Sequence, residues 1–158
     1  MHRVIFLQLA ITVALLISGC GTSKQIVHFP DQDKLVEEES KARVYVIGRP
    51  LFMQPASHSV TLTIVADQEW IGDIVGHSYL CWEREPGILT IASRRLSGNV
   101  VTLAVEKGKV YYILAHIHPG FDATSIAPGG GHIIVNFEIV DNKEGEEALR
   151  KSKPPEQR

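Results

Sequence analysis

The chain has 158 residues, of which 44% are apolar and 22% are charged. This composition is ordinary for one globular domain, and it excludes a wholly disordered or collagen-like chain. The formal net charge of −2 provides no positive field for a nucleic-acid backbone, so we expect no nucleic-acid partner. Two cysteines are too few for a disulfide framework. We therefore expect one small domain with additional segments at its ends.

The first segment, residues 1–19, has the layout of a secretory signal peptide that is removed. Arg3 precedes a mostly apolar stretch from Val4 to Ile17, and Ser18-Gly19 supply the small residues of a cleavage site. The apolar stretch is shorter than the ~20 residues that span a bilayer. A transmembrane or buried core helix is the alternative interpretation.

The sequence Ile17-Ser18-Gly19-Cys20 resembles the lipobox of bacterial lipoproteins. The resemblance implies cleavage before Cys20, diacylation of its sulfur and usually acylation of its new amino group. Two or more acyl chains anchor a protein stably, whereas one holds it only marginally. Gly21 stands where aspartate would favour inner-membrane retention in enteric bacteria. We therefore expect a lipid-anchored envelope protein at the outer membrane, facing the periplasm.

Residues 20–40 predict a flexible tether that follows the lipidated Cys20. They are polar, contain Pro30, and end close to Glu37-Glu38-Glu39. As a coil of about 20 residues, the tether would separate its ends by roughly 25 Å. A short helix from Asp33 to Lys41 is the alternative.

From Lys41 onward, apolar and polar residues alternate with the period of two that is typical of half-buried strands. Val44 and Val46, for example, alternate with Arg43 and Tyr45. The expected strands cover residues 41–46, 59–64, 69–75, 79–84, 88–93, 101–106, 111–117 and 133–139.

Turn residues separate the expected strands. The turns are Ala66-Asp67-Gln68, Pro86-Gly87, Ser97-Gly98-Asn99 and Lys107-Gly108-Lys109. We therefore expect an all-β fold over residues 41–141, a small antiparallel β-sandwich or barrel of about eight strands. Residues 142–158 form a polar C-terminal tail, in which a short helix is possible over residues 144–151.

Four motifs point to one protein family. They are the lipobox, the expected strand Lys41–Val46, the Pro86-Gly87 turn into Ile88–Ile91, and the stretch from Glu106 to Ile113 with its Gly-Lys turn and paired tyrosines. Together they resemble bacterial lipoproteins that carry domain of unknown function 2846. The resemblance covers roughly residues 41–140. It implies a compact β domain on a lipid anchor, and it brings no established activity or catalytic residues.

Three histidines form the sharpest candidate site. His116 and His118 share one face of an expected strand, and His132 begins the next. If His118 lies opposite His132, Ile134 lies opposite His116 and all three imidazoles share one face, with cross-strand Cβ atoms within about 5 Å. Three histidines are a ligand set for zinc or copper. Solvated histidines on a strand face are the alternative.

Cys81 is the only free thiol once Cys20 is lipidated. It lies in a strand-like run, which favours a buried, inert thiol over a reactive one. The aromatic residues Trp70, Tyr79 and Trp82 are candidates either for sugar stacking or for the core.

The sequence contains neither a phosphate-binding loop nor a G-x-S-x-G nucleophile elbow. We therefore expect a non-enzymatic binding or assembly module without a cofactor, whose partner is an envelope protein or peptidoglycan. A metal-binding lipoprotein that uses His116, His118 and His132 is the alternative function, and a small hydrolase comes third.

Overall fold

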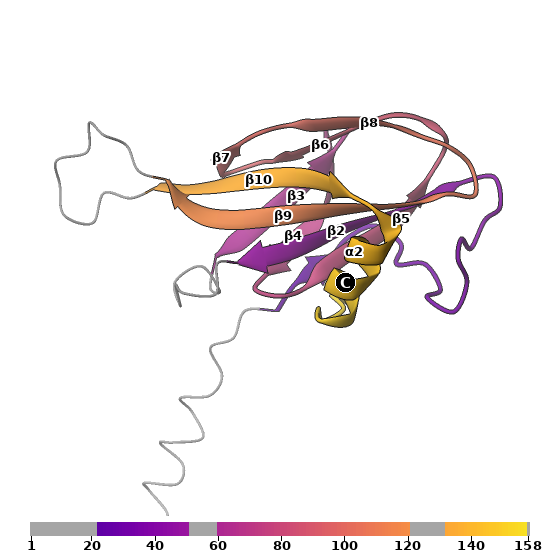
Figure 1. Cartoon of the computed structure of the whole chain (residues 1–158), viewed down its shortest axis with the longest axis horizontal. Helices are drawn as coiled ribbons and strands as arrows, with labels where there is room; N and C mark the ends of the chain where they lie inside the picture. Colours follow the sequence, from indigo (N-terminus) through magenta and orange to yellow (C-terminus); the bar gives the residue numbers. More distant parts are fainter. Residues whose placement is uncertain (1–21, 51–59, 121–131, 158) are drawn as a thin grey trace, which may run out of the picture.

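The computed structural model describes residues 22–50, 60–120 and 132–157, and it folds them into two facing β-sheets with one helix (Figure 1). The elements are β1 (Lys24–Gln25), β2 (Ala42–Pro50), β3 (Thr61–Ala66), β4 (Glu69–Val75), β5 (Tyr79–Arg84), β6 (Gly87–Ser93), β7 (Ser97–Gly98), β8 (Val101–Val105), β9 (Val110–Gly120), β10 (His132–Val140), α2 (Asn142–Arg150) and β11 (Glu156–Gln157). Every strand expected from the alternation coincides with a strand of five or more residues.

The two sheets confirm the all-β sandwich. One sheet has the order β11-β1-β4-β3-β6-β8, the other has the order β5-β2-β9-β10-β7, and neither closes into a barrel. The expectation of purely antiparallel strands is wrong in detail, because β2–β9, β7–β10 and β1–β11 pair in parallel. The expected turn at Ser97-Gly98 is the short strand β7.

The main core lies between the sheets and follows the predicted alternation. Val44 and Val46 of β2 are fully buried against Leu62 and Ile64 of β3. Gly108 has a φ of 72° at the predicted turn before β9, a left-handed conformation that glycine adopts without strain.

A second apolar cluster covers the outer face of the five-stranded sheet, the face that the alternation predicts to be exposed to water. Tyr45 is 5% exposed and its ring stacks on Tyr112, with ring centroids 5.2 Å apart. Helix α2 covers this face through Ala148 and through Gly145, where a side chain would overlap the Tyr112 ring. The prediction that Arg43 and Tyr45 alternate outward into solvent is therefore wrong, since β2 is buried on both faces.

The segment expected to be a flexible tether is folded onto the sandwich over its described residues 22–40. β1 pairs with β4, with Lys24 opposite Asp73, and it also pairs with β11. The Gln25 side chain donates to the carbonyl of Cys81 and accepts from its backbone N–H, over 2.6 and 2.9 Å. This segment is ordered because the edge of β4 and the side of β5 satisfy its polar groups.

The C-terminal residues are folded as well. Asp141 caps α2 by accepting from the N–H of Glu144, and the predicted short helix is thus present at residues 142–150. The last strand, β11, joins the six-stranded sheet beside β1. No helix within the described residues is long and apolar enough to cross a membrane.

Candidate functional site

A buried ion pair connects the two strands at one side of the five-stranded sheet. Arg43 of β2 lies opposite Glu83 of β5, and their side chains are 1% and 6% exposed. The guanidinium donates to Glu83 through Nη2 at 2.8 Å and Nε at 3.1 Å. Isolated buried charges are costly, so these two groups depend on each other and on further hydrogen bonds.

The N-terminal segment supplies four such bonds. Arg43 donates to the carbonyls of Asp31 and Lys34, at 2.8 and 2.6 Å. Glu83 accepts from the backbone N–H groups of Glu37 and Glu38, at 2.5 and 3.0 Å. The ion pair therefore holds residues 31–38 against the sheet.

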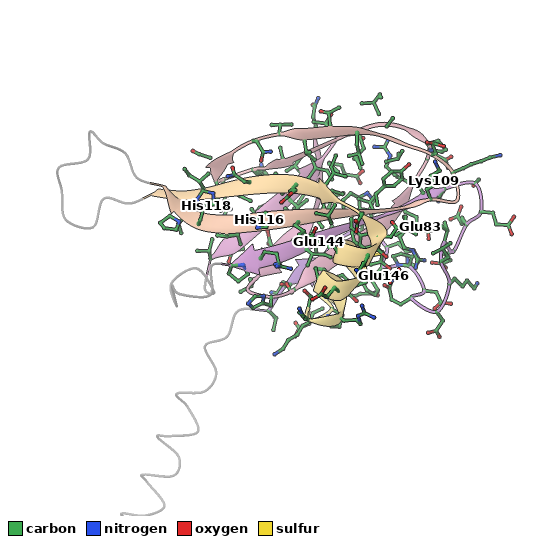
Figure 2. The ribbon with its side chains drawn as sticks, in the orientation of Figure 1. Glu83, Lys109, His116, His118, Glu144 and Glu146 are labelled. Atoms are coloured by element: carbon green, nitrogen blue, oxygen red, sulfur yellow. The ribbon has the colours of Figure 1, made fainter. Side chains whose placement is uncertain are left out.

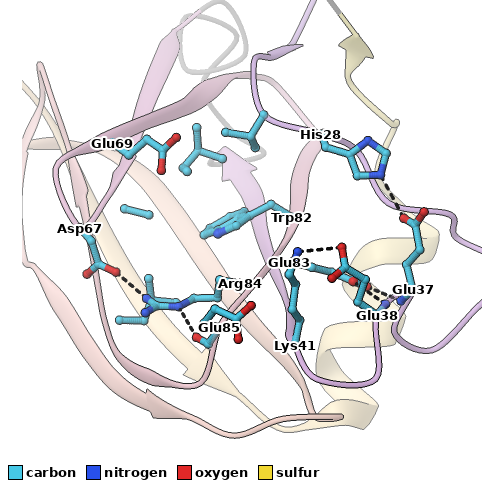
Figure 3. Close-up of a pocket in the computed structure, with 14 residues that line it drawn as sticks. His28, Glu37, Glu38, Lys41, Asp67, Glu69, Trp82, Glu83, Arg84 and Glu85 are labelled. Carbon is cyan, nitrogen blue, oxygen red and sulfur yellow. Dashed lines mark hydrogen bonds and ion pairs between the residues drawn. The ribbon is translucent and has the colours of Figure 1, made fainter.

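This segment forms one wall of a cleft of about 370 Å³, shown in Figure 3. Trp82, Ile71 and Leu89 supply apolar lining, and six carboxylates, two basic side chains and His28 supply the polar lining. The charged residues are Glu37, Glu38, Lys41, Asp67, Glu69, Glu83, Arg84 and Glu85. The volume lies within the range of small-molecule pockets, and the charges favour a cationic ligand.

Most of the charged groups around the cleft are already paired. Asp67 pairs with Arg84, and Lys41 donates to Glu38 over 2.7 Å. The hydrogen bond from His28 and the backbone N–H of Asp31 lower the pKa of Glu37. Glu69, at the start of β4, belongs to no ion pair among the residues that the structure describes.

Cys81 lies in the second apolar cluster and has the character of a buried, inert thiol. Its side chain is fully buried, and desolvation raises its pKa to about 11. At neutral pH the nucleophilic thiolate is therefore scarce. Tyr79 and Trp82 are also buried, whereas Trp70 is 38% exposed.

The histidines of the β9–β10 hairpin differ from the expected register by two residues. His118 lies opposite Ile134 and His116 opposite Asn136, so His132 pairs with Gly120 instead of His118. A shift of two residues keeps every side chain on its face, so alternation alone does not distinguish the two registers.

The two hairpin histidines on β9 have partners on β10. His116 Nε2 donates to Glu138 at 3.0 Å, and Asn136 Nδ2 donates to His118 Nε2 at 2.9 Å. Figure 2 shows them at the end of the hairpin away from Glu83 and Lys109. The described residues include no group of three metal-ligating side chains. The His132 side chain lies outside them, and zinc or copper binding stays a prediction.

A second cavity, of about 740 Å³, lies at the end of the molecule that carries His116. The end of β2, the turn after β4 and the chain after α2 surround it. Its lining contains the basic residues Arg49, Lys151 and Lys153, the histidines His77 and His116, and none of the described carboxylates. Sequence reasoning missed both cavities, because their charged residues come from segments far apart in the chain.

Cys20 and the lipobox lie outside the described residues, so lipidation stays a prediction. Comparisons with models of protein families, with curated proteins and with solved structures found no match. The resemblance to domain of unknown function 2846 likewise stays a prediction from the sequence.

The burial of the Arg43–Glu83 ion pair predicts how much stability the protein loses when the arginine is replaced. Arg43→Met leaves Glu83 buried without its cation, and we expect a loss of about 3–5 kcal/mol in the free energy of unfolding. Trypsin should also cleave faster after Lys34, whose carbonyl loses its donor. Urea unfolding and timed proteolysis measure the two effects.

The matched control is Arg84→Met, which breaks the Arg84–Asp67 pair. Because Asp67 is 45% exposed, this loss should stay near 0–1 kcal/mol. Equal destabilisation of the two variants would contradict the role given to Arg43.

Proposed function

We propose that this chain is an envelope lipoprotein, anchored through acylated Cys20, whose β-sandwich acts as a non-enzymatic binding or assembly module. One observation supports the proposal: Ser23, three residues after Cys20, is hydrogen-bonded at the edge of a sheet. Ser23 accepts from the backbone N–H of Val75 at 2.6 Å, and its backbone carbonyl accepts from Glu156 at 2.8 Å. The start of the domain is thus attached to the edge of a sheet.

This arrangement supports a domain held against its membrane instead of one on a long tether. Two residues span at most about 7 Å, compared with roughly 25 Å for the coil expected from the sequence. A lipid on Cys20 would therefore fix which end of the sandwich faces the bilayer.

The partner surface would be the acidic cleft of Figure 3, at the end of the sandwich away from the anchor. Thr22 and Ser23 lie near Val75 at the end of β4, whereas Glu69 and Asp67 line the cleft at its beginning. Seven strand residues separate the two by about 20 Å. The cleft would thus point into the periplasm, where its carboxylates favour a cationic group on an envelope protein or on peptidoglycan.

The anchor is tested by acylation in a bacterial host. Wild-type chain and Cys81→Ala should both incorporate an alkyne analogue of palmitate and fractionate with membranes. Cys20→Ala should carry no label, because it lacks the sulfur that accepts the diacylglyceryl group. Cys81→Ala is the matched control, since it removes the other cysteine. Undiminished label on Cys20→Ala would refute the anchor.

The binding module is tested by site-specific photo-crosslinking in cells. A photoreactive residue at Glu69, on the cleft rim, should give discrete adducts with an envelope component after irradiation. The same residue at Thr102, exposed on β8 and not among the residues that line the cleft, is the control. The proposal fails when position 69 gives no adduct beyond those of position 102 and of the sample kept in the dark.

A further inference from the structure

We infer that the basic cavity beside the start of the fold is a contact site for anionic phospholipid headgroups. The inference rests on the proposed function, because only an anchored chain presents this end to a bilayer. The observation that carries it is a juxtaposition: Arg49, Lys151 and Lys153 line one cavity, and Ser23, near the start of the described residues, lies beside it.

Strand directions place these residues at one end of the sandwich. β2 and β9 run in parallel, so Arg49, next to the end of β2, lies beside its register partner His116 in the second half of β9. β4 ends at Val75, and Ser78 after it forms a bridge with Lys153. The same Ser78 contacts Ser23 through a hydrogen bond between their hydroxyls. The cavity and the start of the described chain are therefore neighbours.

Figure 1 agrees with this arrangement. The indigo start of the described chain and the C-terminus lie on the same lower side of the view, beside α2. Helix α2 runs from Asn142 to Arg150, and Lys151 and Lys153 follow directly after it. The helix thus brings two of the three basic residues back towards the anchored end.

The charges of the molecule are separated between its two ends. The cleft away from Thr22 has six carboxylates among its lining residues, whereas the described lining of this cavity has none. Three of the carboxylates nearby have partners: Glu147 pairs with Lys151, Glu138 with His116, and Glu156 accepts from Thr22. Arg49 and Lys153 belong to no ion pair within the described part of the chain.

A membrane surface fits this distribution better than a soluble anion does. The two-residue connection to Cys20 keeps Thr22 within about 7 Å of the acylated residue. The basic residues beside the start of the described chain would therefore experience the surface potential of anionic lipids, which falls off within a Debye length of ~8 Å at physiological ionic strength. The acidic cleft at the other end would be repelled, and this repulsion would reinforce the same orientation.

The test uses residues 21–158 without the lipid, which include every described strand, α2 and both apolar clusters. The unlipidated chain should sediment with vesicles that contain phosphatidylglycerol and not with pure phosphatidylcholine vesicles. Salt raised to about 0.5 M should release it, since screening weakens the attraction. No acyl chain is involved in this assay. Absence of binding to the anionic vesicles would therefore count against the basic cavity and not against the Cys20 anchor.

Variants locate the contact. Each basic residue near an anionic surface strengthens binding about fivefold, so Arg49→Gln/Lys151→Gln/Lys153→Gln should weaken vesicle binding by on the order of 100-fold. The matched control is Lys107→Gln/Lys109→Gln/Lys143→Gln. It removes the same charge from exposed positions in the β8–β9 turn and at the start of α2 and should retain binding.

Three outcomes would overturn the inference. They are equal binding to neutral vesicles, equal loss in the two triple variants, and displacement of the protein from vesicles by inorganic phosphate at matched ionic strength. The last outcome would assign the cavity to a free phosphate group instead of a membrane surface.

Discussion

Arg43 and Glu83 face each other across β2 and β5, and the rest of the N-terminal half is arranged around their charges. Removing two charges from water costs several kcal/mol per ion, which a single ion pair offsets poorly. The backbone of residues 31–38 supplies the missing partners, two carbonyls for the guanidinium and two N–H groups for the carboxylate. The buried Arg43–Glu83 pair therefore needs these backbone partners. The same four hydrogen bonds hold residues 31–38 in place.

The position of this segment affects two parts of the surface. Its Gln32 side chain hydrogen-bonds Tyr45 and Cys81 of the second apolar cluster, and Glu37 and Glu38 line the acidic cleft. A chain with a formal net charge of only −2 therefore has an acidic cleft at one end and a basic cavity at the other. We propose that the basic end contacts the membrane and the acidic end contacts the partner.

Alternation predicted the strands and the inter-sheet core because burial between two sheets imposes a period of two. It failed where both faces of β2 are buried, since Arg43 and Tyr45 resemble solvent-facing residues until a distant segment covers them. It also left the hairpin register open by two residues, because His116 keeps its face in either register. The parallel pairs β2–β9 and β1–β11 join segments far apart in sequence, and no local signal specifies them.

The central claim, that residues 22–40 are part of the folded domain, is tested most directly by amide hydrogen exchange. Ile26 donates to Ile71 at 3.0 Å, and Glu37 and Glu38 donate to the buried Glu83. Exchange of peptides from residues 22–41 should be slowed at least about 100-fold relative to the urea-unfolded chain, as expected for amides that exchange only through unfolding. Exchange of this segment at the unfolded rate, while β2 and β9 stay protected, would contradict the account and restore a flexible tether.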